Sequence, residues 1–376
     1  MNKPLVSIVI INYNTKHLLD GCLKSLNEQT YPHLEIIFID NLSTDGSCEH
    51  VKKYHHKVIP VCNDKNLGYS EGANQGIGMA KGEYIMLLNP DILFEKDYIE
   101  KCIVKMEEDH KIAAIAGKLY KYDFQNHKKT NFIDTAGLFC YRNRRVIDNG
   151  QGLEDEGQFD TPKQVFGISG ACPIYRKKAL DDVSIPQELN NKQRTHGARA
   201  QHSEKSGSAS FERSGANTRE YLDKDFFMYK EDVDISWRFL LFGWKSYYLP
   251  SAVANHGRGT GVLKRFTHWE VYKNRSKLNE FQKYYSFKNQ RLMQMKNELF
   301  MNVIHDFFPM AWKELLIFFY VILREPFLIK AWFVMWKQVP GILKKRRYIM
   351  KHKRVGWREM EKWLSGKKSE YLLSGK

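Results

Sequence analysis

The sequence predicts an α/β fold: a mostly parallel sheet with an antiparallel extension, helices on both faces, and a C-terminal α-helical region. Three observations predict it. Buried β-branched runs alternate with helical patterns over the first 90 residues, hairpin-like segments follow, and the last hundred residues are helical and aromatic. The chain has 376 residues and 43% hydrophobic content. We expect residues 1–264 and 265–376 to form two structural regions.

The first part of the chain contains four short apolar runs of strand length, separated by segments with helical spacing. These runs are Val6 to Ile11, Leu34 to Ile39, Lys57 to Cys62 and Tyr84 to Leu88. Strands that alternate with helices pair in parallel, and such sheets bind ligands at the carboxyl ends of their strands. The functional site is therefore expected at that edge.

The middle of the chain has a different pattern. Residues 132–141 and 145–148 predict a hairpin joined across 142–144, and residues 164–174 predict one further strand. Residues 184–222 are polar and small, which predicts an inserted mobile loop. This insert is either a loop that gates a ligand site or a tolerated surface insertion.

Positive charge is concentrated at the C-terminal end. The chain has 59 Lys and Arg against 43 Asp and Glu, and residues 301–376 carry 16 basic but only 6 acidic side chains. Aromatic residues are interleaved with these cations, and residues 344–347 are all basic. Such a segment either lies on an anionic membrane surface or forms a helical subdomain or homodimer interface. No nucleic-acid-binding motif accompanies the charge, so nucleic acid is not the expected partner.

The compartment is predicted from the cysteines and from the apolar runs. The six cysteines form no CxxC pair and no His/Cys cluster, so reduced thiols and no thiolate zinc site are expected. The longest apolar run, Leu315 to Leu323, would span about 14 Å as a helix, and the N-terminus shows no signal-peptide pattern. We expect a cytoplasmic protein, peripheral on the inner face of the cell membrane.

Two carboxylates follow predicted strands and could serve a ligand. Asp40 is followed by polar residues able to hold a base and ribose, and Tyr13 offers a ring for stacking. Asp91 could hold a divalent cation, Mg²⁺ or Mn²⁺, against a diphosphate. Helix capping and an Asp-Pro turn are the structural alternatives for these carboxylates.

Two further segments carry polar residues in unusual density. In residues 226–238, Asp234 and Arg238 are spaced for an ion pair on a helix, which leaves Glu231 and Asp232 as acid/base candidates. His256 is either an ordinary loop histidine or a ligand, and its glycine-rich surroundings with Arg258 would suit a diphosphate. The glycines of residues 66–76 could let backbone approach a ligand closely.

Taken in order, these segments resemble the motifs of family 2 glycosyltransferases, and most closely the bacterial rhamnosyltransferase-like branch. The resemblance covers about residues 4–264. It is carried by VSIVIINYN (6–14), IDNLSTDG (39–46), NLG (66–68), LNPD (88–91), ISGA (168–171), FMYKEDVD (227–234) and PSAVANH (250–256).

The resemblance implies a GT-A fold and an inverting transfer of a sugar from a dTDP- or UDP-linked donor, with a divalent cation as cofactor. It implies Asp232 as the catalytic base with Glu231 beside it, and Asp91 and His256 as metal ligands. Asn89 stands where the family has the first carboxylate of its metal motif. The implied donor-binding residues are Ile11, Tyr13, Asp40, Asn66, Gly68, Asn89, Asp91 and Arg258; the implied acceptor-binding residues are Ser169, Gly170 and Trp237.

The sequence therefore predicts a non-processive glycosyltransferase that adds one sugar to a glycan or lipid-linked glycan acceptor in cell-surface polysaccharide synthesis. Rhamnose is the expected sugar. The alternative is a non-catalytic transferase fold that binds a glycan or an anionic surface. Retention of Asp40, Asp91 and Asp232 together favours the enzyme.

Overall fold

A computed structural model describes residues 3–190, 219–257 and 275–364. Fourteen strands occur in these residues. They are β1 (Val6–Asn12), β2 (Leu34–Asp40), β3 (Val58–Cys62), β4 (Tyr84–Leu88), β5 (Ile92–Phe94), β6 (Ile112–Asp123), β7 (Lys128–Thr135), β8 (Leu138–Cys140), β9 (Val146–Asp148), β10 (Lys163–Val165), β11 (Ile174–Arg176), β12 (Ile185–Pro186), β13 (Arg219–Glu220) and β14 (Lys245–His256).

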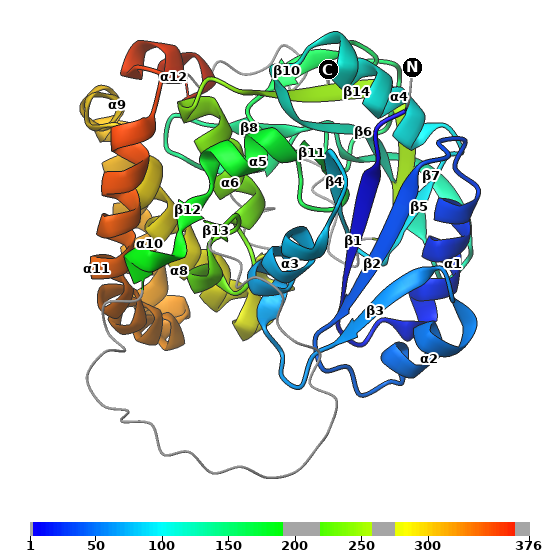
Figure 1. The fold of residues 1–376 in the computed structure, drawn as a ribbon. Helices are drawn as coiled ribbons and strands as arrows, with labels where there is room; N and C mark the ends of the chain where they lie inside the picture. Colours follow the sequence, from blue (N-terminus) through cyan, green and yellow to red (C-terminus); the bar gives the residue numbers. More distant parts are fainter. Residues whose placement is uncertain (1–2, 191–218, 258–274, 365–376) are drawn as a thin grey trace.

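The helices of the described residues cover both faces of the main sheet (Figure 1). They are α1 (Lys16–Asn27), α2 (Ser47–Tyr54), α3 (Gly68–Met79), α4 (Tyr98–Glu108), α5 (Lys177–Val183), α6 (Glu231–Leu241), α8 (Glu280–Asn297), α9 (Phe300–His305), α10 (Phe307–Arg324), α11 (Ile329–His352) and α12 (Trp357–Leu364).

The main sheet has ten strands, and its central path runs β10-β14-β6-β11-β4-β1-β2-β3. Strands β4, β1, β2 and β3 pair in parallel, which confirms the alternating prediction. Strand β11 lies antiparallel between β4 and β6, and β10, β5 and β7 also pair antiparallel, which confirms the antiparallel extension. Helix α3 packs so closely on β1 that a Cβ on Gly76 would lie 2.2 Å from the Val9 side chain.

The hairpin is confirmed only in part, and the single strand predicted over residues 164–174 is wrong. Residues 132–135 of the predicted first arm belong to β7, which pairs with β6. Strand β8 pairs antiparallel with β9 across residues 141–145. Residues 163–176 instead form two strands, β10 and β11, which pair with different partners. The segment between them turns past the sheet edge, and Asn89 N–H donates to the Ala171 carbonyl there. An apolar run can thus contain a turn that its hydropathy hides.

Of the predicted insert, only the ends lie within the described residues. Strands β12 and β13 pair antiparallel, so residues 185–186 and 219–220 close the base of the insert. Its central part, including residues 191–218, lies outside the described residues.

The structure corrects the expectation that the thiols are reduced. Helix α2 packs beside β3, and Cys48 of α2 forms a disulfide with Cys62 at the end of β3, with 6.1 Å between their Cα atoms. The two cysteines are 14 residues apart, and no motif in the sequence marks such a pair. Cys22, Cys102, Cys140 and Cys172 are free and buried.

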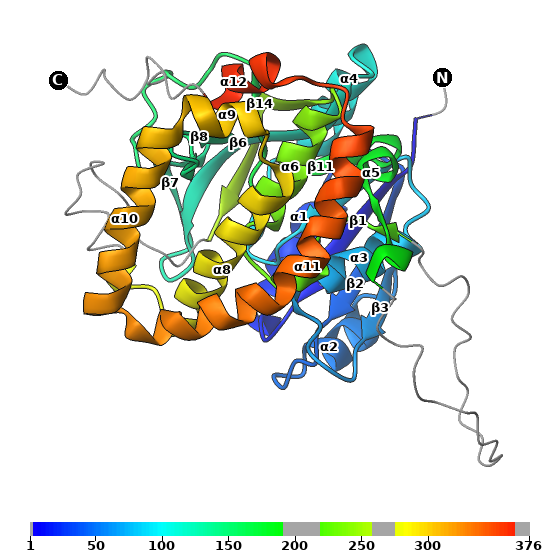
Figure 2. The same ribbon diagram turned by 90° about the vertical axis from the view of Figure 1, so that its left-hand side faces the viewer.

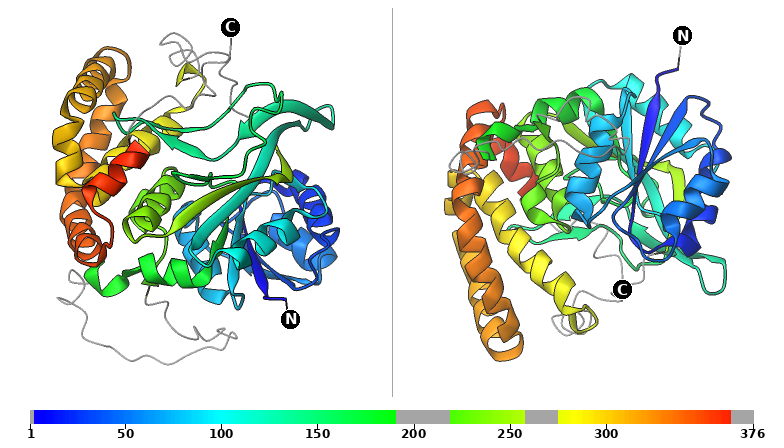
Figure 3. Two further views of the ribbon diagram at one scale, coloured as in Figure 1. Left: turned by 90° about the horizontal axis from the view of Figure 1, so that it is seen from above. Right: turned by 60° about the horizontal axis from the view of Figure 1, so that its bottom comes forward.

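The C-terminal helices share one core with the sheet. Leu292 of α8, Ile342 of α11 and Met360 of α12 pack in the same hydrophobic cluster as Val9 and Trp237. In Figures 1 and 3 these helices stand together on the side of the sheet away from α1, with α6 between them and the sheet. Residues 275–364 are therefore packed as part of the molecule around α6.

Buried ion pairs reinforce this packing. One of them involves the basic run 344–347, which was expected to lie on a membrane surface or to form a helical subdomain or homodimer interface. Lys345 is fully buried and donates to the carboxylates of Glu220, Asp223 and Asp225. Lys296 of α8 donates to Asp223 and Asp234. Lys345 is thus part of the fold, and only Lys344 and Arg347 of the run are exposed.

Helix α10 is the exception to this burial. Of its 18 residues only Val321 is buried, although the helix is strongly apolar. Phe308 is 83% exposed and Leu323 is 74% exposed. The helix lies at the outer edge of the helical layer (Figure 2). No helix in the described ranges is long and apolar enough to cross a bilayer.

Candidate active site

One large cavity of about 1460 Å³ lies at the carboxyl ends of the parallel strands. It is lined by the ends of β1 and β4 with the start of α3, by the β8–β9 hairpin and residues 169–171, by the start of α6 with the segment before it, and by residues of α8 and α10. This position agrees with the general rule for ligand sites in open α/β sheets.

The predicted donor-binding residues that line the cavity are Ile11, Tyr13, Asn66, Gly68, Asn89 and Asp91. Tyr13 is 51% exposed, so its ring is available for stacking. Asn41, one of the polar residues after Asp40 that could hold a base and ribose, lines the same region. Its side chain donates to the Gly68 carbonyl, which ties the loop after β2 to the start of α3.

Asp40 does not line the cavity. Its carboxylate is 2% exposed and accepts hydrogen bonds from the Asn12 amide and from the backbone and hydroxyl of Ser43. Asp40 thus holds the loop after β2 against the end of β1, one layer beneath the cavity surface. The predicted contact with a base stays a prediction.

Asp91 and His256 meet at the cavity wall, as predicted. Asp91 Oδ2 lies 3.3 Å from His256 Nε2, and His256 Nδ1 lies 2.7 Å from Asp134 Oδ2. The pKa of His256 is raised to about 9, despite the opposing effect of burial, because both carboxylates bond to the ring. Arg258, which was also expected near a diphosphate, lies outside the described residues.

These residues fit a divalent cation. Asp91 Oδ1 is buried and has no hydrogen-bond partner within the described part of the chain. A carboxylate oxygen in that position can serve a cation as a ligand. Asp134 would fix the orientation of His256 from behind, as carboxylates do for metal-bound histidines. Asp134 was not predicted, since its strand carried no signal beyond the hairpin pattern.

Asp232 and Glu231 begin α6 and lie in the cavity wall. Asp232 Oδ2 accepts from the Gly170 N–H at 3.1 Å, and Oδ1 accepts from the Val233 N–H at 2.8 Å. Glu231 Oε2 has no partner in the described ranges. Burial raises the pKa of both carboxyls, and burial together with the neighbouring Asp232 raises the pKa of Glu231 to about 8.

The segment that presents these carboxylates has unusual backbone geometry. Phe227, Tyr229 and Lys230 have φ angles of 65°, 70° and 76°, which non-glycine residues rarely adopt. The Asn289 amide of α8 donates to the carbonyls of residues 226, 228 and 229. A side chain from the C-terminal helices thus holds the segment in place.

Gly68 meets the same segment from α3. Its φ is +76°, and a Cβ there would lie 2.5 Å from the Phe227 ring. The Ser70 N–H donates to the Phe227 carbonyl. Glycine is required here both by its backbone conformation and by this close approach.

The structure places two of the three predicted acceptor-binding residues at the cavity and the third in the core. Ser169 and Gly170 line the cavity beside Asp232, and the Tyr69 hydroxyl donates to the Gly170 carbonyl. Trp237 is fully buried and packs edge-to-face on Phe166, so its assignment to the acceptor site is wrong. On α6, residue 237 is more than one turn past Asp232 and faces the core. The predicted pair of Asp234 and Arg238 is confirmed at 3.1 Å.

The acceptor side also contains residues that were not predicted. Asp148 at the end of β9, Arg145, and Trp312 and Lys313 of α10 line the cavity there. The sequence placed the α10 residues in a separate region, and nothing in their spacing indicated that the helix would turn back over the sheet.

Comparison with known proteins agrees with this geometry. Residues 7–184 match the family model described as Glycosyl transferase family 2. Glycosyltransferase GlyG of Streptococcus pneumoniae is 33% identical over 139 residues, 36% of this chain and 46% of that protein. TuaG, a Bacillus subtilis glycosyltransferase provisionally assigned to teichuronic acid biosynthesis, is 31% identical over 109 residues, 28% of this chain and 43% of that protein. The chain thus spans less than half the length of either relative.

A solved structure shares the fold. GalNAc-T7, crystallised with UDP, GalNAc and Mn²⁺, superposes with a TM-score of 0.51 at 13% identity, over 78% of this chain and 48% of that one. The GT-A prediction is therefore confirmed at the level of the fold.

Proposed function

We propose that the protein is an inverting, non-processive glycosyltransferase that moves one hexose from a nucleotide-diphosphate sugar to a glycan acceptor. The match of residues 7–184 to the Glycosyl transferase family 2 model supports this proposal. One observation carries this proposal. Asp232, held by two backbone N–H groups, and the Asp91–His256 pair line the same cavity, so the proposed acid/base group and the proposed diphosphate-binding residues face one space.

Each end of the cavity has a part in the proposed reaction. Asp232 accepts the proton of the acceptor hydroxyl as that oxygen attacks the anomeric carbon and the bond to the diphosphate breaks. Ser169 and Gly170 border the acceptor. Tyr13, Ile11, Asn41 and Asn66 border the nucleotide. A cation held by Asp91 and His256 would neutralise charge on the departing diphosphate.

The identity of the donor and of the product is proposed from two similar proteins. GalNAc-T7 was crystallised with UDP, which makes UDP-linked sugars the first donors to test, with dTDP-linked rhamnose as the specific sugar we propose. TuaG is provisionally assigned to a polysaccharide pathway, which supports a cell-surface polysaccharide as product.

The exposed apolar face of α10 supports a lipid-linked acceptor and peripheral attachment to the inner face of the cell membrane. Trp312 and Leu316 of α10 line the cavity while Phe308 and Leu323 on the same helix are open to solvent. One helix could therefore touch a bilayer and border the acceptor at once.

The test is a screen of UDP- and dTDP-sugars for hydrolysis and transfer, with wild type and Asp232→Asn compared on every active donor. We expect the variant to lose about 100-fold or more in kcat, because an amide cannot accept the proton, with donor affinity nearly unchanged. Near-wild-type turnover by Asp232→Asn would contradict the assignment of the base. Absence of turnover by wild type on all donors would favour the non-catalytic scaffold.

A further inference from the structure

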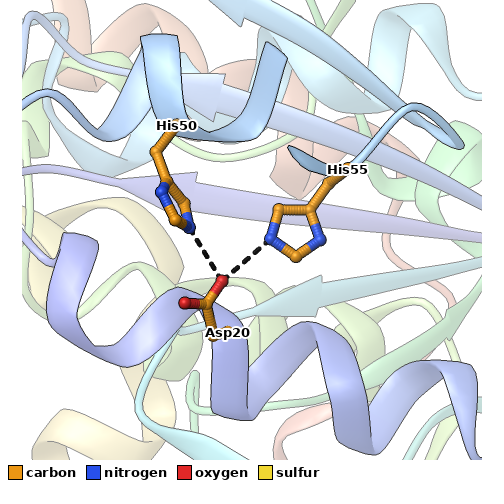
Figure 4. Close-up of side chains that lie close together, drawn as sticks. All are labelled: Asp20, His50 and His55. Carbon is orange, nitrogen blue, oxygen red and sulfur yellow. Dashed lines mark hydrogen bonds and ion pairs between the residues drawn. The ribbon is translucent and has the colours of Figure 1, made fainter. Parts of the chain in front are cut away.

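A second cluster of potential metal ligands lies away from the cavity, on the far side of the sheet edge formed by β2 and β3. Asp20 of α1, His50 of α2 and His55, the residue after α2, converge there (Figure 4). Asp20 Oδ1 lies 2.7 Å from His50 Nε2 and 2.9 Å from His55 Nε2. None of the three residues lines the proposed active site.

We propose that Asp20, His50 and His55 bind a transition-metal ion, with Zn²⁺ as the reference metal. Two imidazoles and one carboxylate are a ligand set that suits Zn²⁺, Ni²⁺ or Cu²⁺, whereas Mg²⁺ prefers oxygen ligands only. The ligand atoms all lie within 4.8 Å of one another.

The geometry needs little rearrangement. Both Nε2 atoms point at the same carboxylate oxygen, so their lone pairs meet at one place (Figure 4). An ion bound at about 2.0–2.2 Å from each ligand requires that oxygen to move back by roughly 2 Å. The Asp20 side chain is 71% exposed and can rotate, while the two histidines are only 16% and 17% exposed and are held by their surroundings.

Such an ion would tie α1 to the end of α2. The two elements are already joined at the other end of α1, where the Lys16 N–H donates to Asp45 Oδ2 and the Thr44 N–H to Asn14 Oδ1. The loop that makes these two hydrogen bonds follows β2 and begins with Asn41, which lines the cavity. The ion would therefore stiffen the helix pair beneath the nucleotide side of the proposed site.

The experiment measures Zn²⁺ binding to the full chain by calorimetry, and thermal unfolding with Zn²⁺ and with chelator. It is done in the Asp91→Asn background with excess Mg²⁺, so that the proposed catalytic cation site does not contribute. We expect one Zn²⁺ per chain and a higher unfolding midpoint. His50→Gln and His55→Gln should each weaken binding about 100-fold, since even groups that only orient ligands contribute 10- to 100-fold.

His110→Gln, a change at an exposed histidine outside the cluster, is the matched control and should bind as the background protein does. Equal Zn²⁺ affinity in the background and in the His50→Gln/His55→Gln double variant would overturn the proposal, as would the absence of binding in the background protein. Loss of transfer activity in the wild type would not affect this test, which depends on binding and unfolding alone.

Discussion

At the scale of single residues, the Glu231 carboxyl is held in an environment that favours its neutral form. It is buried beside Asp232, and one of its oxygens has no partner in the described ranges. Between the usual pKa of 4.5 and the folded value of about 8, the folded protein keeps a proton that the unfolded chain has lost. Folding stability at this site therefore falls as pH rises through that window and levels off above pH 8.

Glu231→Gln should remove this loss of folding stability at high pH. At pH 5 the variant and wild type should have similar free energies of unfolding, and at pH 8 the variant should be more stable by on the order of 4 kcal/mol. Urea unfolding at pH 5, 6.5 and 8 measures the difference. The exposed Glu28→Gln is the control and should give no such trend. Parallel stability curves for Glu231→Gln and wild type would refute the account.

Asp91→Ala should remove cation-assisted donor binding. Of the cavity residues predicted to hold the metal, Asp91 is the only carboxylate. Without it, the cation would have only the neutral Asn89 amide and the His256 ring as ligands. Affinity for the nucleoside diphosphate, measured with Mn²⁺ and with chelator, should depend on the cation in wild type and not in the variant. If chelator leaves wild-type binding and rate unchanged, the cation has no part in the reaction.

At the scale of elements, α8 acts as a support for the catalytic segment. Asn289 donates to three carbonyls of a segment that contains three non-glycine residues with positive φ. Without these bonds the segment would relax toward ordinary backbone angles and shift Asp232. Small displacements of a catalytic group can cost about 100-fold in rate.

Asn289→Ala should therefore lower kcat by roughly 10- to 100-fold with donor affinity retained, and destabilise the fold by about 2 kcal/mol. Asn297→Ala is the matched control, because Asn297 is buried on the same helix but donates to Asp234. It should lose similar stability and keep kcat. Equal kcat losses in both variants would mean that α8 acts through stability alone.

The elements also show what the sequence could predict. The βαβ pattern identified the four parallel strands because β1, β2 and β4 are largely buried on both faces and read as continuous apolar runs, as Val6 to Ile11 does. The strand ends then identified Asp91, and position within a dense polar segment identified Asp232. The acceptor-binding prediction for Trp237 was wrong, because the sequence does not show whether an aromatic residue near a site faces the core or the cavity. Asn289, Asp134 and Trp312 could not be found, since their roles arise from contacts with residues more than 50 positions away.

At the scale of the whole molecule, the distribution of apolar surface distinguishes α10 from every other described helix. Exposed cations follow these aromatic and aliphatic side chains in the chain, with Arg324 at the end of α10 and Lys330 and Lys337 on α11. Aromatic insertion and attraction to anionic lipid act together in such a surface. The proposed membrane attachment therefore depends on α10 more than on the partly buried run 344–347.

Replacing Phe308, Phe319 and Leu323 together by Ser should weaken binding to phosphatidylglycerol liposomes by about tenfold or more, because each buried apolar side chain contributes about 1.5–3 kcal/mol. None of the three lines the cavity, so transfer to a short soluble acceptor should survive. Val104→Ser, at an exposed site on α4, is the control. If the triple variant instead converts a dimer to a monomer by light scattering, α10 is an oligomer interface.

The ion cluster at the base of α6 has a consequence for the synthesis of the chain. Glu220 and Asp223 are buried, and their counter-charges come from Lys296 and Lys345, whereas the buried Asp234 pairs both with Lys296 and with Arg238 of its own helix. During translation the three carboxylates are made many residues before either lysine. Until Lys345 has left the ribosome, α6 cannot settle in its final position without burying uncompensated negative charge, which costs several kcal/mol. In the nascent protein, the strands and helices that border the proposed nucleotide site could thus fold first, while Glu231 and Asp232 reach their final positions only after α11 has been made.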